Sequence, residues 1–162
     1  MARMEIKGID DWMQKLSNYS DHIDEIAEKA VKAGANPVAD EIRSSLASLP
    51  EDKFRYLRDG DFFSGVPSTQ RKDLLEGFGI TPVDVDHEGN TNVKIGFAGY
   101  GSHKTKKYPK GIPNALLARA IESGSSVRKK SPFVRKAVKR TKDKAISDMK
   151  KVIDEETKIY AL

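Results

Sequence analysis

The chain has 162 residues, of which 38% are apolar and 33% charged, and it contains no cysteine. This length suits a single domain spanning residues 1–162, and the missing cysteines exclude disulfides, thiolate metal ligands and cysteine nucleophiles. No apolar run approaches the roughly 18 to 20 residues that cross a bilayer, and no apolar signal core follows the first residues. We therefore expect synthesis in the cytoplasm and no membrane partner.

The formal net charge of +5 conceals a gradient along the chain. Residues 1–52 carry 6 Lys and Arg against 11 Asp and Glu, which gives −5. Residues 53–111 carry 10 against 7, which gives +3, and residues 112–162 carry 13 against 6, which gives +7. This asymmetry fits an anionic partner for the basic end, attraction between unlike ends of identical subunits, or a solvated surface.

The first third of the chain predicts helices. Residues 4–8 are typical of a short strand, and the apolar spacing from Ile9 to Leu16 predicts a short amphipathic helix. A long helix follows, with Ser20 as its N-cap and acidic residues in its first turn. Pro37 lies inside this helix, where it lacks an N–H donor and crowds the preceding turn, so we expect a kink or a break there.

The middle of the chain predicts loops around one hairpin. Periodicity lapses near residues 50–71, which predicts a long flexible loop with room for one helical turn. Residues 77–86 and 92–97 alternate apolar with polar or small residues and predict antiparallel strands. Pro82 cannot donate to a ladder, so we expect an edge or a bulge at that position. Residues 98–112, rich in Gly and Lys, predict a second flexible loop.

Two helices are predicted in the last third. Pro113 suits the first turn of a helix that Gly124 ends, and Ser131 followed by Pro132 begins a helix running to about Thr157. The apolar stripe expected on this last helix consists of Val134, Val138, Ala145, Met149 and Val152, with Phe133, Ile146 and Ile153 on its flanks. The pattern predicts an α+β fold, with a small antiparallel β-sheet packed with a long N-terminal helix and a long C-terminal helix.

The sequence offers no assembled catalytic site. The three histidines lack a second ligand at the spacing of a helical metal site. The glycine-rich stretch 96–105 differs from a phosphate-binding P-loop because Ser102 and His103 separate its last glycine from Lys104. No serine occupies a Gly-x-Ser-x-Gly elbow. We therefore expect no catalytic residues, no metal and no cofactor.

Two basic clusters are candidate surfaces for a partner or for DNA. The first lies in the second loop, where cations alternate with aromatic residues as in many nucleic-acid contacts, and its lysines are Lys104, Lys106, Lys107 and Lys110. The second consists of Arg128, Lys129, Lys130, Arg135, Lys136, Lys139, Arg140, Lys142 and Lys144, and on a helix Arg135, Lys139 and Lys142 share one stripe. Both clusters fit DNA, an acidic protein surface or a solvated face. No base-reading motif is present, so a DNA contact would be to the backbone and salt-sensitive.

The order of three sequence blocks resembles the neck and tail-completion proteins of tailed bacteriophages. The first block is residues 4–12 with Gly8, followed by a long helix, and the second is residues 73–80. The third joins a Glu-x-Gly turn, formed by Glu122 and Gly124, to a Pro-Phe-x-x-x-Ala helix start at Pro132 and Phe133. Together the blocks extend over nearly the whole chain.

The resemblance implies a non-enzymatic structural protein with one head–tail joining domain. It implies a homo-oligomeric ring, expected to be a hexamer, at the head–tail junction or on the upper end of the tail tube, where it completes the tail and docks it to the head. The implied partners are further copies of the chain, head-completion or connector proteins, and tail tube or terminator proteins. The basic clusters add packaged DNA as a non-specific contact. The implied location is the virion, after assembly in the host cytoplasm. The competing hypothesis is a small basic DNA-binding protein that contacts the phosphate backbone without sequence specificity.

Overall fold

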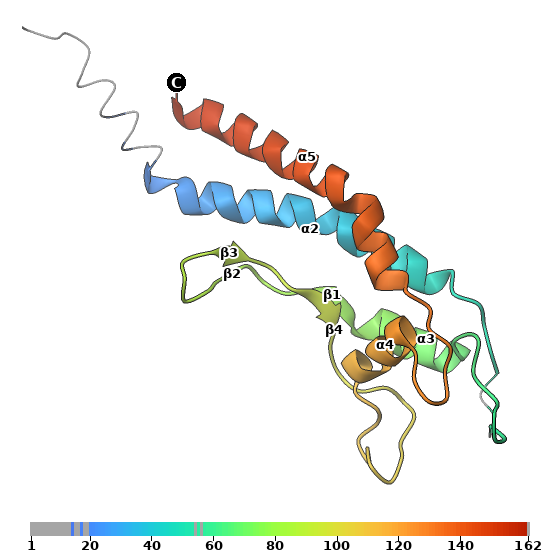
Figure 1. Cartoon of the computed structure of the whole chain (residues 1–162). Helices are drawn as coiled ribbons and strands as arrows, with labels where there is room; N and C mark the ends of the chain where they lie inside the picture. The colour runs from blue at the N-terminus through green and yellow to red at the C-terminus, as the bar shows by residue number, and fades with distance from the viewer. Residues whose placement is uncertain (1–13, 15–16, 18–19, 54, 56, 162) are drawn as a thin grey trace, which may run out of the picture.

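The computed structural model describes residues 14, 17, 20–53, 55 and 57–161 (Figure 1). The strand predicted at residues 4–8, including Gly8, lies outside the described residues. Nearly all of the helix predicted from Ile9 to Leu16 lies outside them as well.

Two long helices lie side by side and run in opposite directions (Figure 1). They are α2 (Ile23–Ala47) and α5 (Phe133–Ala161). The ring of His22, just before α2, stacks on Tyr160 near the end of α5 with 4.1 Å between ring centroids. Helix α5 ends at Ala161, four residues later than the predicted end near Thr157.

Helix α2 continues through Pro37, so the break allowed for at this residue is wrong. Pro37 is partly exposed, and Ala35 and Ala39, each two residues away and therefore on the opposite face of the helix, are buried. Burial of that face offsets the backbone hydrogen bond that Pro37 cannot donate. The predicted N-cap is also wrong, because His22 and not Ser20 precedes the first residue of α2.

Helix α3 (Ser68–Gly77) begins within the segment near residues 50–71 that the sequence predicted as loop, and it continues beyond that segment. Only Gln70 and Leu74 are buried in it, so its apolar periodicity is too weak to be read from the sequence. The irregular segment before it is correspondingly shorter than predicted and ends at Pro67. Val66 is 1% exposed and pairs with the segment after α2, because its N–H donates to the carbonyl oxygen of Pro50 at 2.8 Å.

The predicted hairpin is confirmed, in two short sections. Strand β1 (Phe78–Ile80) pairs antiparallel with β4 (Ile95–Phe97), and β2 (Asp84–Val85) pairs antiparallel with β3 (Thr91–Asn92). Pro82 lies in the interruption between the sections, as its missing donor predicts.

The core lies where α3, α4 (Asn114–Ser123) and the β1–β4 section meet the adjoining ends of α2 and α5. Its fully buried large side chains are Leu46, Leu74, Ile121 and Val66. The buried face of α5 differs from the predicted stripe, since Phe133 and Ala137 enter the core and Val138 remains 45% exposed. The architecture is the predicted α+β fold with a small antiparallel sheet and long terminal helices.

Candidate functional site

The second loop, residues 98–112, is folded back on itself by backbone hydrogen bonds. Gly101 N–H donates to the carbonyl oxygen of Ile112 at 2.8 Å, and Ile112 N–H donates to that of His103 at 3.1 Å. Thr105 and Tyr108 exchange N–H donors and carbonyl acceptors, both at 3.1 Å. We call this segment the lysine loop. Its flexibility, like that of the loop after α2, stays a prediction.

The lysine loop is attached to the helical body at its base. The Asp73 carboxylate on α3 accepts the N–H of Ser102 at 2.7 Å and the hydroxyl of the same residue at 2.5 Å. The Asn114 side chain at the start of α4 is 3% exposed and donates to the carbonyl oxygens of Ala98 at 2.8 Å and Asp73 at 3.2 Å. These contacts fix the loop to two helices.

The four predicted lysines of this loop are all exposed. Residues 98–112 contain no Asp or Glu, and among the ion pairs between described residues none involves Lys104, Lys106, Lys107 or Lys110. The Lys107 ammonium lies 5.6 Å from the ring centroid of Tyr108, and Tyr100 is 61% exposed. The structure therefore brings the first basic cluster together on one projecting loop (Figure 1).

Arg128 requires a correction, because it is 7% exposed and cannot face a partner. Its guanidinium donates to the carbonyl oxygen of Gly65 at 2.6 Å and to Oε1 of Gln70 at 2.8 Å, and it lies 5.3 Å from the ring centroid of Phe63. Burial lowers the pKa of this guanidinium, and the charge of Asp52 opposes that shift. Arg128 therefore holds the segment between α2 and α3 against the segment between α4 and α5.

Arg135, another member of the second cluster, is engaged by Glu122 at the end of α4. The Glu122 carboxylate accepts Nε–H of Arg135 at 2.8 Å and the backbone N–H groups of Val134 and Arg135 at 2.8 and 3.2 Å. A carboxylate at this position caps the start of α5 and interacts favourably with the helix dipole.

The same contact explains why the Glu-x-Gly and Pro-Phe motifs occur together. Gly124, at φ +81°, ends α4, and a Cβ there would lie 3.1 Å from the backbone nitrogen of Lys130. The chain then returns so that α5 begins at Phe133, directly after Pro132 and beside Glu122; the helix thus begins one residue later than the first-turn position predicted for Pro132. The sequence singled out these residues without revealing the cap that joins them.

The other cations of the second cluster spread over two places. Lys130, Lys136 and Arg140 line a groove of about 320 Å³ between the end of α2 and the start of α5. Arg140 also pairs with Glu41 on α2 at 2.9 Å. Of the remaining exposed cations, Lys129 lies before α5, Lys139 and Lys142 lie along it, and Lys144 on α5 pairs with Asp148 at 2.9 Å. The second cluster is therefore not one continuous surface.

The acidic and basic segments of the sequence meet within one subunit, because α2 lies against α5. The ammonium of Lys29 on α2 pairs with Glu156 on α5 at 2.9 Å and with Glu25 at 3.0 Å. Hydrogen bonds to Glu156 and then to Glu25 raise the pKa of Lys29 above its usual range. The pair between Arg140 on α5 and Glu41 on α2, at 2.9 Å, joins a cation of the basic segment to an anion of the acidic segment and so compensates part of the charge asymmetry.

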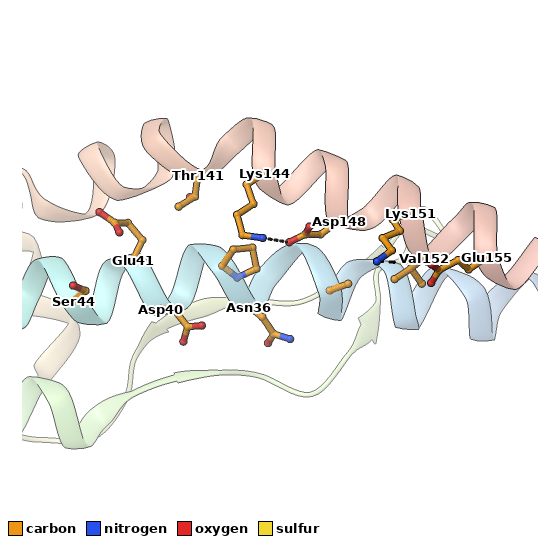
Figure 2. A pocket seen from close by; sticks show the side chains of 12 residues that line it. Asn36, Asp40, Glu41, Ser44, Thr141, Lys144, Asp148, Lys151, Val152 and Glu155 are labelled. Atoms are coloured by element: carbon orange, nitrogen blue, oxygen red, sulfur yellow. Dashed lines mark hydrogen bonds and ion pairs between the residues drawn. The ribbon is translucent and has the colours of Figure 1, made fainter.

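A groove of about 760 Å³ follows one side of this helix pair (Figure 2). Asp40 and Asn36 line it from α2, and from α5 come pairs of opposite charge one helical turn apart. Lys144 pairs with Asp148 at 2.9 Å, and Lys151 pairs with Glu155 at 3.8 Å. The charged side chains along this groove largely compensate one another.

The outward surface of α5 carries aliphatic side chains that the described residues leave uncovered. Ile146 is 41% exposed and Ile153 is 40% exposed, and they lie two helical turns apart on one stripe. Lys139 and Lys142 continue this stripe toward the start of α5. We call Lys139, Lys142, Ile146 and Ile153 the outer stripe of α5.

The described residues contain no group of three His, Asp or Glu side chains that could hold a metal ion, and none of their helices is long and apolar enough to span a membrane. The features described above define an α+β protein whose distinctive surfaces are a lysine loop and a long, partly apolar helix.

The comparisons with known proteins agree with a structural phage protein. A family model described as "Bacteriophage HK97-gp10, putative tail-component" matches residues 10–103. The chain belongs to this HK97-gp10-like family, whose members are structural, tail-associated components of bacteriophages. Neither the curated proteins nor the solved structures gave a match.

Proposed function

We propose that this protein forms a closed homo-oligomeric ring at the head–tail junction of the phage or at the upper end of its tail tube. There it completes the tail and docks it to the head. Family membership supports a tail-associated structural role, and the ring adds a specific assembly to that role. No substrate is transformed in this proposal.

The observation that carries the proposal is the outer stripe of α5. Single exposed aliphatic residues need no explanation, but Ile146 and Ile153 are each about 40% exposed and lie on the same stripe. Covering both removes apolar surface from water and supplies a driving force for association. Lys139 and Lys142 extend the stripe with charge, as the polar rim of a protein interface does.

Ring closure follows from the type of contact. If the outer stripe packs against a different surface of the next copy, the interface is heterologous, and such an interface closes into a ring when the rotation between neighbours permits. A closed ring matches the cyclic symmetry of a tube end. The sequence suggested attraction between acidic and basic ends, but Lys29–Glu156 and Arg140–Glu41 are pairs within one subunit. We therefore assign the contact mainly to apolar burial.

The experiment uses the phage or prophage that encodes the chain. Its gene is deleted, and the wild-type gene or variants are supplied in trans. The Ile146→Asp and Ile153→Asp double variant places charges on the outer stripe, and we expect separate heads and tails in electron micrographs. Wild-type protein restores joined, infectious particles.

The matched control is Val85→Asp with Ile159→Asp, which changes two aliphatic residues that are 58% and 65% exposed and lie off the stripe. We expect this control to restore joined particles. Circular dichroism of both purified variants shows whether each is folded. Infectious particles without the gene would contradict the proposed function, and equal complementation by both double variants would contradict the role of the outer stripe.

A further inference from the structure

The lysine loop presents positive charge that the rest of the described chain does not compensate. Elsewhere, several exposed lysines have an acidic partner one helical turn away: Lys32–Glu28 at 3.4 Å, Lys72–Glu76 at 3.8 Å, Lys144–Asp148 at 2.9 Å and Lys151–Glu155 at 3.8 Å. The four loop lysines have no such partner among the described residues, and no acidic residue lies in the loop itself. Four uncompensated cations within seven residues are a site for a polyanion.

We propose that the lysine loop binds the phosphate backbone of double-stranded DNA without sequence preference. The site consists of Lys104, Lys106, Lys107 and Lys110, and the exposed Tyr100 belongs to the same loop. It lies within one subunit, so the proposal does not depend on ring formation. In a ring, each subunit adds one loop, and the combined contacts strengthen binding.

The backbone of the loop presents these lysines in a defined arrangement. The hydrogen bonds between Gly101 and Ile112 and between Thr105 and Tyr108 hold its two sides together. Gly111, at φ +111°, allows the close approach, because a Cβ there would collide with the carbonyl oxygen of Gly101. Asp73 fixes the base of the loop to α3 through Ser102. A braced loop loses less conformational entropy on binding than a disordered one.

The composition of the loop favours DNA over an acidic protein surface. Protein interfaces are depleted in lysine and enriched in arginine and large apolar residues, whereas residues 98–112 contain four lysines and no arginine. Phosphate contacts are well served by lysine as a point charge. The loop lacks Arg, Asn and Gln, so it has none of the planar side chains whose fixed geometry pairs two hydrogen bonds with a base edge, and its lysines act as point charges. Backbone contact without sequence preference is the mode that remains.

The second basic cluster is a weaker candidate for the same role. Arg128 is buried, Arg135 is bound by Glu122, and Arg140 is bound by Glu41. The other exposed lysines of this cluster that form no ion pair among the described residues do not form one compact site: Lys130 and Lys136 line the groove beside α2, whereas Lys129, Lys139 and Lys142 lie before α5 or along it. The structure therefore separates two clusters that the sequence left equivalent.

The test measures binding of the full chain to two fluorescent duplexes of unrelated sequence, by anisotropy, over a series of salt concentrations. The loop variant replaces all four loop lysines with Gln, and the control variant is Lys29→Gln, Lys32→Gln, Lys72→Gln and Lys151→Gln, at ion-paired lysines outside both basic clusters. Both variants lower the formal net charge from +5 to +1, so net charge alone cannot separate them. Circular dichroism verifies that both are folded.

We expect wild-type protein and the control variant to bind both duplexes alike. If each loop lysine contacts one phosphate, the slope of log K against log salt includes about −3.6 from one loop, at about −0.9 per phosphate. The loop variant should lose that part of the slope and bind at least about tenfold more weakly at low salt.

Three outcomes would overturn the proposal. Equal loss in both variants would assign the binding to net charge. A strong preference for one duplex would contradict backbone recognition. Poly-glutamate that competes as well as DNA per unit charge would assign the loop to an acidic protein surface. Because this measurement needs no assembled particle, its failure is distinguishable from failure of the proposed ring.

Discussion

Replacing Arg128 with Met tests whether this arginine is an internal tie between two segments. The substitution removes two charge-assisted hydrogen bonds, to Gly65 and Gln70, and each contributes about 1.5–3 kcal/mol net. It also removes a cation–π contact with the ring of Phe63, which contributes about 1–2 kcal/mol. Removing a buried charge recovers part of its desolvation penalty, and the Met side chain fills part of the space. We expect a net loss of about 3 kcal/mol in the free energy of unfolding, or about 6–12 °C in Tm for a chain of this size.

The assay is urea unfolding followed by circular dichroism, with Lys129→Met as the control. Lys129 is the next residue and is exposed, so its replacement should change stability by less than about 0.5 kcal/mol. Adding Gln70→Met to Arg128→Met should cost less than the sum of the two single changes, because both hydrogen-bonding partners are then absent. Equal unfolding midpoints for Arg128→Met and Lys129→Met would refute the burial argument and return Arg128 to the surface.

Two further predictions concern carboxylates that hold local structure. Glu122→Ala should lower the free energy of unfolding by about 1–2 kcal/mol, because α5 loses its cap. Arg135→Ala removes only the exposed partner of Glu122 and should cost less than about 0.5 kcal/mol. Thermal unfolding compares the two variants, and a larger loss for Arg135→Ala would exclude the capping role of Glu122. The pKa of Asp86 lies below its ordinary value of 3.8 because backbone N–H groups of Asn90 and Glu88 donate to its carboxylate. The Asp86 carboxylate therefore stabilises the turn above pH 3.8, and this stabilisation is lost as the pH falls through the lowered pKa. In an NMR titration, the amide resonance of Asn90 should shift with a midpoint below pH 3.8. A midpoint at or above 3.8 would contradict the contact.

The elements that the sequence predicted are those with strong local signals. The long terminal helices carry sustained apolar periodicity, and the hairpin carries alternation with a polar turn. Helix α3 was missed because Gln70 and Leu74 are its only buried residues, so a buried polar side chain stands where the pattern requires an apolar one. The uninterrupted course of α2 through Pro37 depends on tertiary burial, which local propensity does not contain.

The sequence predicted the candidate surfaces only in part, because long-range contacts decide which of their residues are exposed. The lysines of the loop are adjacent in sequence, so their grouping was evident before folding. In the sequence Arg128 resembles its neighbours Lys129 and Lys130. Only its hydrogen bonds to Gln70 and Gly65, which lie 58 and 63 positions earlier in the chain, reveal that it is buried. Asn114, which braces the lysine loop, lies 41 positions from Asp73 and gives no local signal. Long-range polar contacts therefore decide which predicted residues face outward.

The measurement that tests the central claim most directly is the mass of the purified wild-type chain in solution, by sedimentation velocity with native mass spectrometry. The account predicts one closed assembly, expected to be a hexamer, that persists when salt is raised to about 0.5 M because apolar burial and not charge pairing dominates its contacts. The Ile146→Asp and Ile153→Asp variant should remain a folded monomer. A wild-type chain that stays monomeric, or that forms an open series of sizes, would contradict the ring.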